Sequence, residues 1–591
     1  MSVDVNKFRN FTNFNSLCDD IQIEGDWPDN LSGHIFIVAP YHRRTDRHLF
    51  AGEGVIIRCD LQPQGGKVRV RRQKLTTWDS FWHSIQSPIS EILPEAFFPA
   101  RLGLIGVAEI ANTGIVNFDG RPIMTADAGR YWEVDPISLE TITPIGYFDE
   151  HIVSIPLSLF PLVANTAHPF YDPNTHELIT CELKSQLRPG KLFTDMVSAV
   201  YITSWDGEGS LKHWELEGTV LDGSPHTAIV TEKLIMIPDM PFQIGVATLL
   251  GIKVSPLQAY PKTQIYLVNR QDLQPDLKPV PSRLITFEGD SYHFLCNYQH
   301  DDENKINLVA VQQATISVSD AIKPDDVKHF SGDRYTSEYH GIPWMFAFDP
   351  GVLRKVVIEN DAKYAQVISQ EAFIHPGWFS TMLYTADPRE LFAPQGHSAI
   401  YQAYGGYHQD LICRRQYLSF RDHVNRILTD EQLPQHDLPS VLAKVSLAQN
   451  WQELTQKIKT EQSQNPDTPV FNLGKELLDF YVCPDEYIFD SIQFIPQEQN
   501  KGAIFATVLG PQGSEVWLFA AEHISQGPIA KLQPPSINFG FTLHSDYFEQ
   551  VSPRQSHYHV DRWQSAIRSA LKVPYEFLMN RPSDILNRKV N

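Results

Sequence analysis

The chain has 591 residues, of which 42% are hydrophobic and 11% aromatic, and its formal net charge is −21. This composition allows a large buried core, and the lack of a basic cluster excludes the electrostatic footprint of a nucleic-acid-binding protein. The six cysteines show no Cys-x-x-Cys spacing, which indicates reduced thiols rather than a disulfide framework. No apolar run reaches about 18 residues and no signal peptide is evident, so we expect a cytoplasmic protein without a membrane-spanning helix.

Roughly the first 340 residues predict short β-strands that are separated by Gly, Asp, Pro and Asn turns. One unit recurs in this part and just beyond it, namely an apolar strand, an Asp-Pro pair, a turn and a second strand. Its Asp-Pro pairs begin at Asp135, Asp172 and Asp349. Because proline after aspartate starts a turn and is excluded from central strands, these repeated hairpins favour the blades of a β-propeller.

Two stretches between the predicted strands are unusually apolar, residues 152–163 and residues 241–252. They are compatible with core packing or with a helix that lines a cavity. They are equally compatible with an exposed apolar patch that contacts a bilayer surface and gives a lipid-soluble substrate access to a tunnel. We therefore treat both stretches as candidates for peripheral membrane contact.

Residues 385–465 differ from the rest of the chain. Much of this segment consists of helix-forming residues with apolar side chains three and four positions apart, which predicts a helical insertion or cap. Strand patterning resumes near residue 468 and continues to about residue 545.

Four histidines stand at the start of predicted strands and far apart in the sequence: His168, His226, His293 and His544. No two have the spacing of ligands on one helix, so only a closed tertiary structure brings them together. An all-imidazole set suits Fe, Cu, Ni and Zn. With coordination positions left open, such a set is suited to binding and activating a small molecule.

The segments around these histidines resemble motifs of a known family. Residues 166–169 resemble its first ligand motif, 226–241 the second, 293–298 the third and 525–544 the last, while 48–56 and 111–136 resemble two earlier blocks. The family is that of the carotenoid cleavage oxygenases, which include apocarotenoid oxygenases, stilbene-cleaving dioxygenases and the retinal pigment epithelium isomerase. The resemblance covers nearly the whole chain.

This resemblance implies an all-β fold in which residues 1–591 form a single domain. It implies a seven-bladed β-propeller with a loop-and-helix dome over one face, to which the helical insertion at 385–465 is added. It also implies that the four histidines hold Fe(II) on the propeller axis, with O2 as co-substrate. The implied substrate is a lipophilic carotenoid or apocarotenoid, whose C=C bond is cleaved to aldehyde or ketone products.

In this family, glutamates orient three of the four ligands. A ligating histidine usually donates its second N–H to a carboxylate or carbonyl group. Glu486 stands where one of these glutamates is expected, and Asp127 stands where the family usually has a second. No residue matches the third. Thr113 is a candidate neighbour of the open metal position, and capping of a loop is its alternative role.

Two other functions stay open on the sequence. The first is a dioxygenase that cleaves a phenolic stilbene. Such relatives use a Tyr and a Lys to accept the 4-hydroxyl proton, and no such pair is evident here. The second is a carotenoid- or retinoid-binding protein, or an isomerase, that keeps the fold without oxygenating. Because no residue matches the third glutamate, this second, non-oxygenating function stays open.

Overall fold

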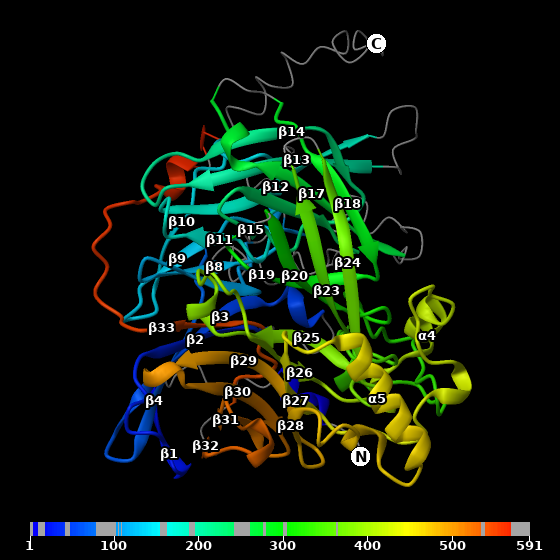
Figure 1. Cartoon of the computed structure of the whole chain (residues 1–591). Helices are drawn as coiled ribbons and strands as arrows, with labels where there is room; N and C mark the ends of the chain where they lie inside the picture. The colour runs from blue at the N-terminus through cyan, green and yellow to red at the C-terminus, as the bar shows by residue number, and fades with distance from the viewer. Residues whose placement is uncertain are drawn as a thin grey trace.

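The computed structural model describes residues 4–9, 18–41, 48–77, 102–103, 106–107, 109–153, 162–187, 196–241, 261–275, 279–299, 304–361, 364–533, 538–565 and 567–568. Strands dominate this part of the chain, and helices are few (Figure 1). The prediction of an all-β fold is confirmed.

Five four-stranded antiparallel sheets follow one another along the chain. The first contains β7 (Gly114–Phe118), β8 (Arg121–Thr125), β9 (Trp132–Val134) and β10 (Thr141–Pro144). The second contains β11 (Phe170–Asp172), β12 (Glu177–Leu187), β13 (Met196–Trp205) and β14 (Lys212–Leu221). The third contains β15 (Ile229–Val230), β16 (Leu234–Asp239), β17 (Lys262–Asn269) and β18 (Arg283–Glu288).

The fourth sheet contains β19 (Ser291–Cys296), β20 (Lys305–Gln312), β23 (Val352–Asn360) and β24 (Ala365–Ile374). The fifth contains β25 (Ser380–Thr385), β26 (Ala399–Tyr404), β27 (Val441–Ser446) and β28 (Asp479–Val482). Two small two-stranded sheets pair β5 (Leu102–Gly103) with β6 (Gly106–Val107), and β21 (Ser317–Ala321) with β22 (Pro343–Trp344).

The remaining strands form one nine-stranded sheet that joins the two ends of the chain. In order, it contains β29 (Ile488–Pro496), β30 (Gly502–Gly510), β31 (Gly513–Ala520), β32 (Ala530–Leu532), β1 (Cys18–Gly25), β4 (Lys67–Lys74), β3 (Glu53–Gln64), β2 (His34–Tyr41) and β33 (Ser545–Phe548). Strand β1 makes the junction, because its residues Cys18 to Gln22 pair with β4 and its residues Ile23 to Gly25 pair with β32.

The number of blades predicted from the family resemblance needs correction. The described residues form five separate four-stranded blades and not seven, since nine of the other strands are merged into one sheet and the remaining four form two small two-stranded sheets. The arrangement is nevertheless that of a β-propeller, because the first strands of consecutive sheets lie side by side. Strand β7 contacts β11, β11 contacts β15 and β15 contacts β19, while β33 contacts both β7 and β29.

The segment 385–465 is mixed rather than helical. It includes α4 (Arg414–Phe420) and α5 (Trp451–Gln464), but it also includes β26 and β27 of the fifth sheet. Helix α5 begins where the Asn450 side chain accepts a hydrogen bond from the backbone N–H of Glu453, and it buries Trp451, Leu454 and Ile458. The three-and-four spacing of these apolar side chains is the signal that the sequence showed.

Short 3-10 helices connect many of the strands. They are η1 (Val5–Phe8), η2 (Leu49–Ala51), η3 (Arg270–Asp272), η4 (Ser337–Tyr339), η5 (Pro388–Glu390), η6 (Gln409–Leu411), η7 (Asp430–Gln432), η8 (Val470–Asn472), η9 (Glu498–Asn500) and η10 (Ile524–Gln526).

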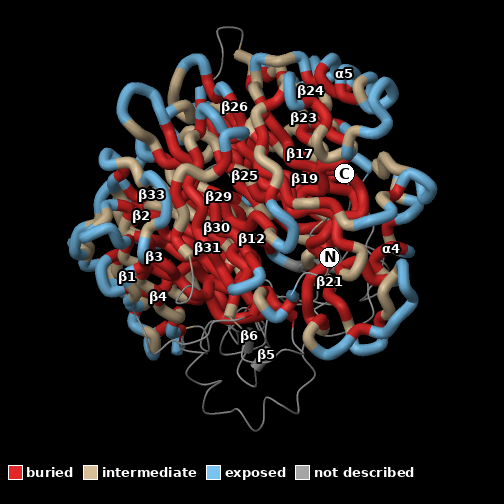
Figure 2. Tube along the Cα trace, turned by 90° about the horizontal axis from the view of Figure 1, so that it is seen from below, coloured by how far each residue is buried: buried red, intermediate tan, exposed pale blue. Residues whose placement is uncertain are grey.

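The core lies between neighbouring sheets, so inner strands are buried on both faces. In β2, Ile35 and Ile37 pack in a cluster with residues of β30 and β31, whereas Phe36 and Val38 pack with residues of the first four-stranded sheet. Figure 2 shows the result as buried chain throughout the interior and exposed chain in the peripheral loops. Strands buried on both faces appear in the sequence as continuous apolar runs rather than as alternation.

Some predictions lie beyond what the structure tests. Most of the two apolar stretches, residues 154–161 and 242–252, lies outside the described residues. Within the described ranges, no helix combines the length and the hydropathy that crossing a bilayer requires. The single domain over 1–591, the dome and the cytoplasmic location stay predictions.

An ion pair connects three consecutive sheets and provides a test of this packing. The carboxylate of Asp172, at the end of β11, is fully buried and accepts hydrogen bonds from Arg270 Nη1 at 2.6 Å and from the Tyr298 hydroxyl at 2.9 Å. We expect Arg270→Ala to lower the free energy of unfolding by about 3 kcal/mol, because it leaves a buried charge without its counterion. Urea denaturation followed by tryptophan fluorescence measures this change.

The matched control is Lys457→Ala, which removes the exposed ion pair of Lys457 with Glu453 in α5. An exposed pair contributes little, so the control should change the free energy of unfolding by less than about 0.5 kcal/mol. Equal effects of the two substitutions would contradict the structural role of the buried pair.

Candidate metal centre

The four histidines lie in or just before four different strands. His168 lies just before β11 and His226 just before β15, His293 lies within β19, and His544 directly precedes β33. Each of the four offers one ring nitrogen, and these nitrogens all lie within 4.8 Å of one another. The structure therefore brings together the four residues that the sequence singled out.

The spacing of the rings fits one shared ion. The ring centroids of His168 and His544 are 4.2 Å apart and those of His226 and His293 are 5.2 Å apart, and the Nε2 atoms of His168 and His293 are 3.3 Å apart. Nitrogens bound at about 2.1 Å to one metal are about 3.0 Å apart at right angles and about 4.2 Å apart across the ion. The separations of the four nitrogens, all within 4.8 Å, are close to these values.

Backbone hydrogen bonds hold the ligand segments together. The backbone N–H of His168 donates to the carbonyl of His226 at 3.0 Å, and the N–H of Ala228 donates to the carbonyl of His168 at 3.0 Å. On the other side, the N–H of Val38 in β2 donates to the carbonyl of His544 at 2.9 Å. The positions of these three ligands therefore depend on strand pairing.

The orientation of His293 is set by a backbone carbonyl. Its Nδ1 lies 3.0 Å from the carbonyl oxygen of Met382. A carbonyl can only accept, so Nδ1 carries the proton and Nε2 presents its lone pair to the other three rings. Met382 has a φ of 71°, which is unusual for a residue with a side chain and marks an irregularity in β25.

A carboxylate sets the orientation of His226. Asp127 is buried in the loop after β8, and its Oδ1 lies 2.6 Å from Nδ1 of His226. The N–H of the imidazole donates to this carboxylate, which leaves Nε2 free as a metal ligand. The shorter side chain of Asp, where the family usually has Glu, therefore reaches the ring directly.

Burial keeps three of the ligands, His168, His293 and His544, neutral. Desolvation, and to a smaller extent the other three rings, lowers the pKa of His168 well below its ordinary value. Desolvation acts in the same way on the pKa of His293, and it lowers the pKa of His544 to about 3. Neutral imidazole is the form that binds a metal, so these rings do not have to release a proton at neutral pH.

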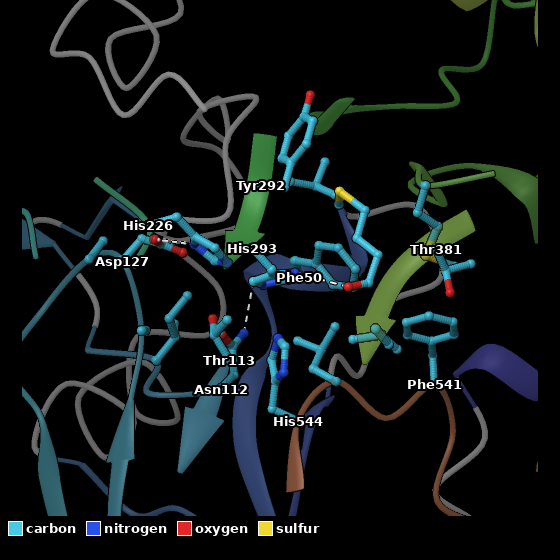
Figure 3. Close-up of a pocket in the computed structure, with 18 residues that line it drawn as sticks. Phe50, Asn112, Thr113, Asp127, His226, Tyr292, His293, Thr381, Phe541 and His544 are labelled. Atoms are coloured by element: carbon cyan, nitrogen blue, oxygen red, sulfur yellow. Dashed lines mark hydrogen bonds and ion pairs between the residues drawn. The ribbon is translucent and has the colours of Figure 1, made fainter. Parts of the chain in front are cut away.

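A largely apolar cavity is lined by three of the four rings, those of His226, His293 and His544 (Figure 3). Asn112, Thr113 and Asp127 line it beside the histidines, and the apolar part of its wall includes Phe50, Ile110, Val318, Met345, Leu383 and Phe541. The described lining contains no Lys or Arg. An apolar cavity with a few convergent polar groups is the usual form of a site for a small lipophilic molecule.

Comparison with known proteins assigns the chain to a family. The sequence profile described as retinal pigment epithelial membrane protein (RPE65) matches residues 10–549. The chain belongs to the RPE65 family. This membership confirms the resemblance to carotenoid cleavage oxygenases that the motifs showed.

Solved structures share the fold of this RPE65-family chain. A variant of the Synechocystis apocarotenoid oxygenase is 15% identical and matches with a TM-score of 0.60 over 92% of this chain and 98% of that one. The cobalt-substituted form of the Synechocystis enzyme is 16% identical, with a TM-score of 0.59 and the same coverage. A curated relative, Resveratrol cleavage oxygenase 1 of Chaetomium globosum, is 28% identical over 175 residues, which are 28% of this chain and 27% of that protein.

Of the two other residues that the family pattern indicated, one lines the cavity and the other is exposed. Thr113 lines the cavity, and its hydroxyl donates to Oδ1 of Asn112 at 3.1 Å. Glu486 is exposed in the turn before β29, has a φ of 70°, and makes none of the hydrogen bonds described for the four histidines. The prediction that Glu486 orients a ligand is wrong, because the turn directs it to solvent.

Two groups that position the site were missed in the sequence. The Met382 carbonyl has no signal in residue type, since any residue carries a carbonyl. Asp490 did leave a signal, because it is an acid within the apolar strand β29. Its Oδ2 accepts hydrogen bonds from the backbone N–H of Thr542 at 2.6 Å and from the Thr542 hydroxyl at 2.8 Å, two residues before His544. Burial raises the pKa of Asp490 well above its ordinary value.

Replacing one ligand tests the four-histidine site. We expect His226→Ala to abolish retention of the bound metal, because three ligands from separate strands hold an ion far more weakly than four. Metal content per chain after gel filtration, measured by mass spectrometry, provides the readout. His557→Ala, which changes an exposed histidine, should retain the wild-type content, and stoichiometric metal in His226→Ala would contradict the assignment.

A second substitution tests the carboxylate behind His226. We expect Asp127→Ala to lower metal affinity about 10- to 100-fold, because the imidazole loses the acceptor that fixes its tautomer and direction. Asp127→Asn keeps an acceptor oxygen and should have a smaller effect. Competition with a chelator measures the affinity, Glu486→Ala is the control that should leave it unchanged, and a larger effect of Glu486→Ala than of Asp127→Ala would refute the assignment.

Proposed function

We propose that this chain is a non-haem Fe(II)-dependent dioxygenase that cleaves a C=C bond of a carotenoid or apocarotenoid into aldehyde or ketone fragments. The observation that carries the proposal is the convergence of four imidazole nitrogens beside an apolar cavity. Among metals that suit imidazole, iron is favoured, since zinc has no accessible redox step. Bound to His168, His226, His293 and His544, Fe(II) would supply the redox chemistry that a reaction of O2 with a double bond requires.

The residues of the chain have defined tasks in such a reaction. Four imidazole ligands leave coordination positions for small molecules, and Asp127 and the Met382 carbonyl keep the proton of two ligands on Nδ1. The apolar wall binds a polyene by buried area and excludes water from the reacting bond. Thr113 lines the cavity together with three of the four rings.

The route of the substrate forms a further part of the proposal. A carotenoid resides in lipid, and residues 152–163 and 241–252 are apolar enough to contact a bilayer surface. Most of both stretches lies outside the described residues, so their sequence alone supports this peripheral contact.

Two alternatives correspond to named relatives. Cleavage of a stilbene is supported by the similarity to Resveratrol cleavage oxygenase 1, but the described cavity wall lacks a Lys that could stabilise a phenolate. Isomerisation without oxygenation is supported by the family profile itself. The apolar wall favours a polyene over a stilbene.

Oxygen labelling separates these functions. We expect iron-loaded protein, incubated under ¹⁸O2 with a panel of carotenoids, apocarotenals and stilbenes, to release labelled carbonyl fragments from a polyene. Mass spectrometry of the products identifies the bond and the label, with His226→Ala protein as the control. Products without label indicate an isomerase, labelled products from stilbenes alone indicate the first alternative, and no product from the iron-loaded protein refutes the proposal.

A further inference from the structure

Strand β25 is irregular where it borders the cavity. Three consecutive residues, Thr381, Met382 and Leu383, line the cavity wall, although successive side chains of a regular strand point to opposite faces. The pairing of β25 with β26 shifts register between Ser380 and Tyr384, and Met382 has a positive φ. These are the features of a bulge, which re-aims side chains beside functional sites.

This irregularity, the 380–384 bulge, serves both the metal centre and the cavity. It turns the Met382 carbonyl toward Nδ1 of His293. It also places the preceding residue, Thr381, in the cavity wall. Figure 3 shows Thr381 beside Phe541, across the view from His226 and Asp127.

The hydroxyl of Thr381 has no hydrogen-bond partner within the described part of the chain, although the atom is fully buried. Its methyl group fixes the rotamer, because Cγ2 lies only 2.3 Å from where a Cβ on Gly405 would stand. Gly405 thus provides the space for the methyl group, and a β-branched side chain has little freedom at χ1. A buried hydroxyl without a partner costs about 1–3 kcal/mol, so a ligand that supplies the partner gains affinity.

The surroundings of Thr381 restrict what that ligand can be. The wall of the same cavity includes the apolar side chains of Phe50, Val318, Met345 and Phe541. A molecule that fits here is apolar along its length and carries one oxygen where it meets the hydroxyl. A pure hydrocarbon fills the same volume but leaves the hydroxyl unpaired.

We propose that Thr381 is a specificity-determining residue whose hydroxyl hydrogen-bonds a carbonyl or hydroxyl oxygen of the substrate. The substrate is then an oxygen-bearing apocarotenoid rather than a hydrocarbon carotene. This inference rests on the proposed function for its substrate class, and it refines that function by selecting among polyenes.

The test compares an apocarotenal with a hydrocarbon polyene of matched length. Equilibrium binding to the metal-loaded full chain without O2, followed by quenching of tryptophan fluorescence, is measured together with kcat/KM in air. We expect the wild-type protein to prefer the apocarotenal at least tenfold. Thr381→Val should reduce binding and kcat/KM for the apocarotenal about tenfold, as expected for one hydrogen bond, and change the values for the hydrocarbon less than about twofold.

Two further variants keep the test specific. Thr381→Ser retains the hydroxyl and should retain the preference for the apocarotenal. Thr385→Val makes the same exchange in the same strand, where the hydroxyl already accepts a hydrogen bond from the backbone N–H of Phe494, and the preference should again persist.

The outcomes separate this inference from the proposed function. A preference that Thr381→Val leaves intact overturns the role of Thr381, whether or not the polyene is cleaved. A preference lost in Thr381→Val but without cleavage by wild-type protein supports the role of Thr381 and refutes the dioxygenase. A wild-type protein that binds neither polyene overturns both.

Discussion

The structure depends on the removal of imidazoles from water. Buried imidazole is stable only in its neutral form, and mutual repulsion among His168, His293 and their neighbours strengthens this preference. A neutral ring offers a lone pair. The desolvation of the imidazoles at the centre of the fold therefore also prepares them to bind a cation. Strand pairing supplies the restraint that keeps these lone pairs facing one another, since His168 is hydrogen-bonded to the His226 backbone and His544 to Val38.

The acceptor of the second ring nitrogen differs between His226 and His293. His226 has a carboxylate as its acceptor, whereas His293 has only a peptide carbonyl. A carboxylate adds negative charge close to the ion and raises the basicity of the ligand, while a carbonyl fixes direction without adding a full charge. The metal centre is consequently less negative than one with carboxylates behind every ring, which changes the electrostatic environment of a bound cation.

Much of the fold and the site could be predicted from the sequence, for identifiable reasons. Histidines in separate strand-start motifs, and a carboxylate at Asp127, leave signals in residue type and local pattern. The segment 385–465 could be predicted only in part, because the apolar spacing of α5 is local but the pairing of β26 with β27 is not. The predicted number of blades was wrong because β1 pairs with both β4 and β32, and this pairing is a property of tertiary structure. The position of Glu486 could not be predicted, because one glutamate gives no signal for a left-handed turn. The role of the Met382 carbonyl could not be predicted from side chains, because it is a backbone group.

The nine-stranded sheet has a consequence for how the protein acquires its ion. Strand β2, from the beginning of the chain, pairs with β33 from near its end, and His544 directly precedes β33. Three of the four ligands are therefore synthesised long before the fourth. Full coordination must wait until β33 has paired with β2, so the nascent chain cannot hold the metal in this form before the segment with His544 has been made.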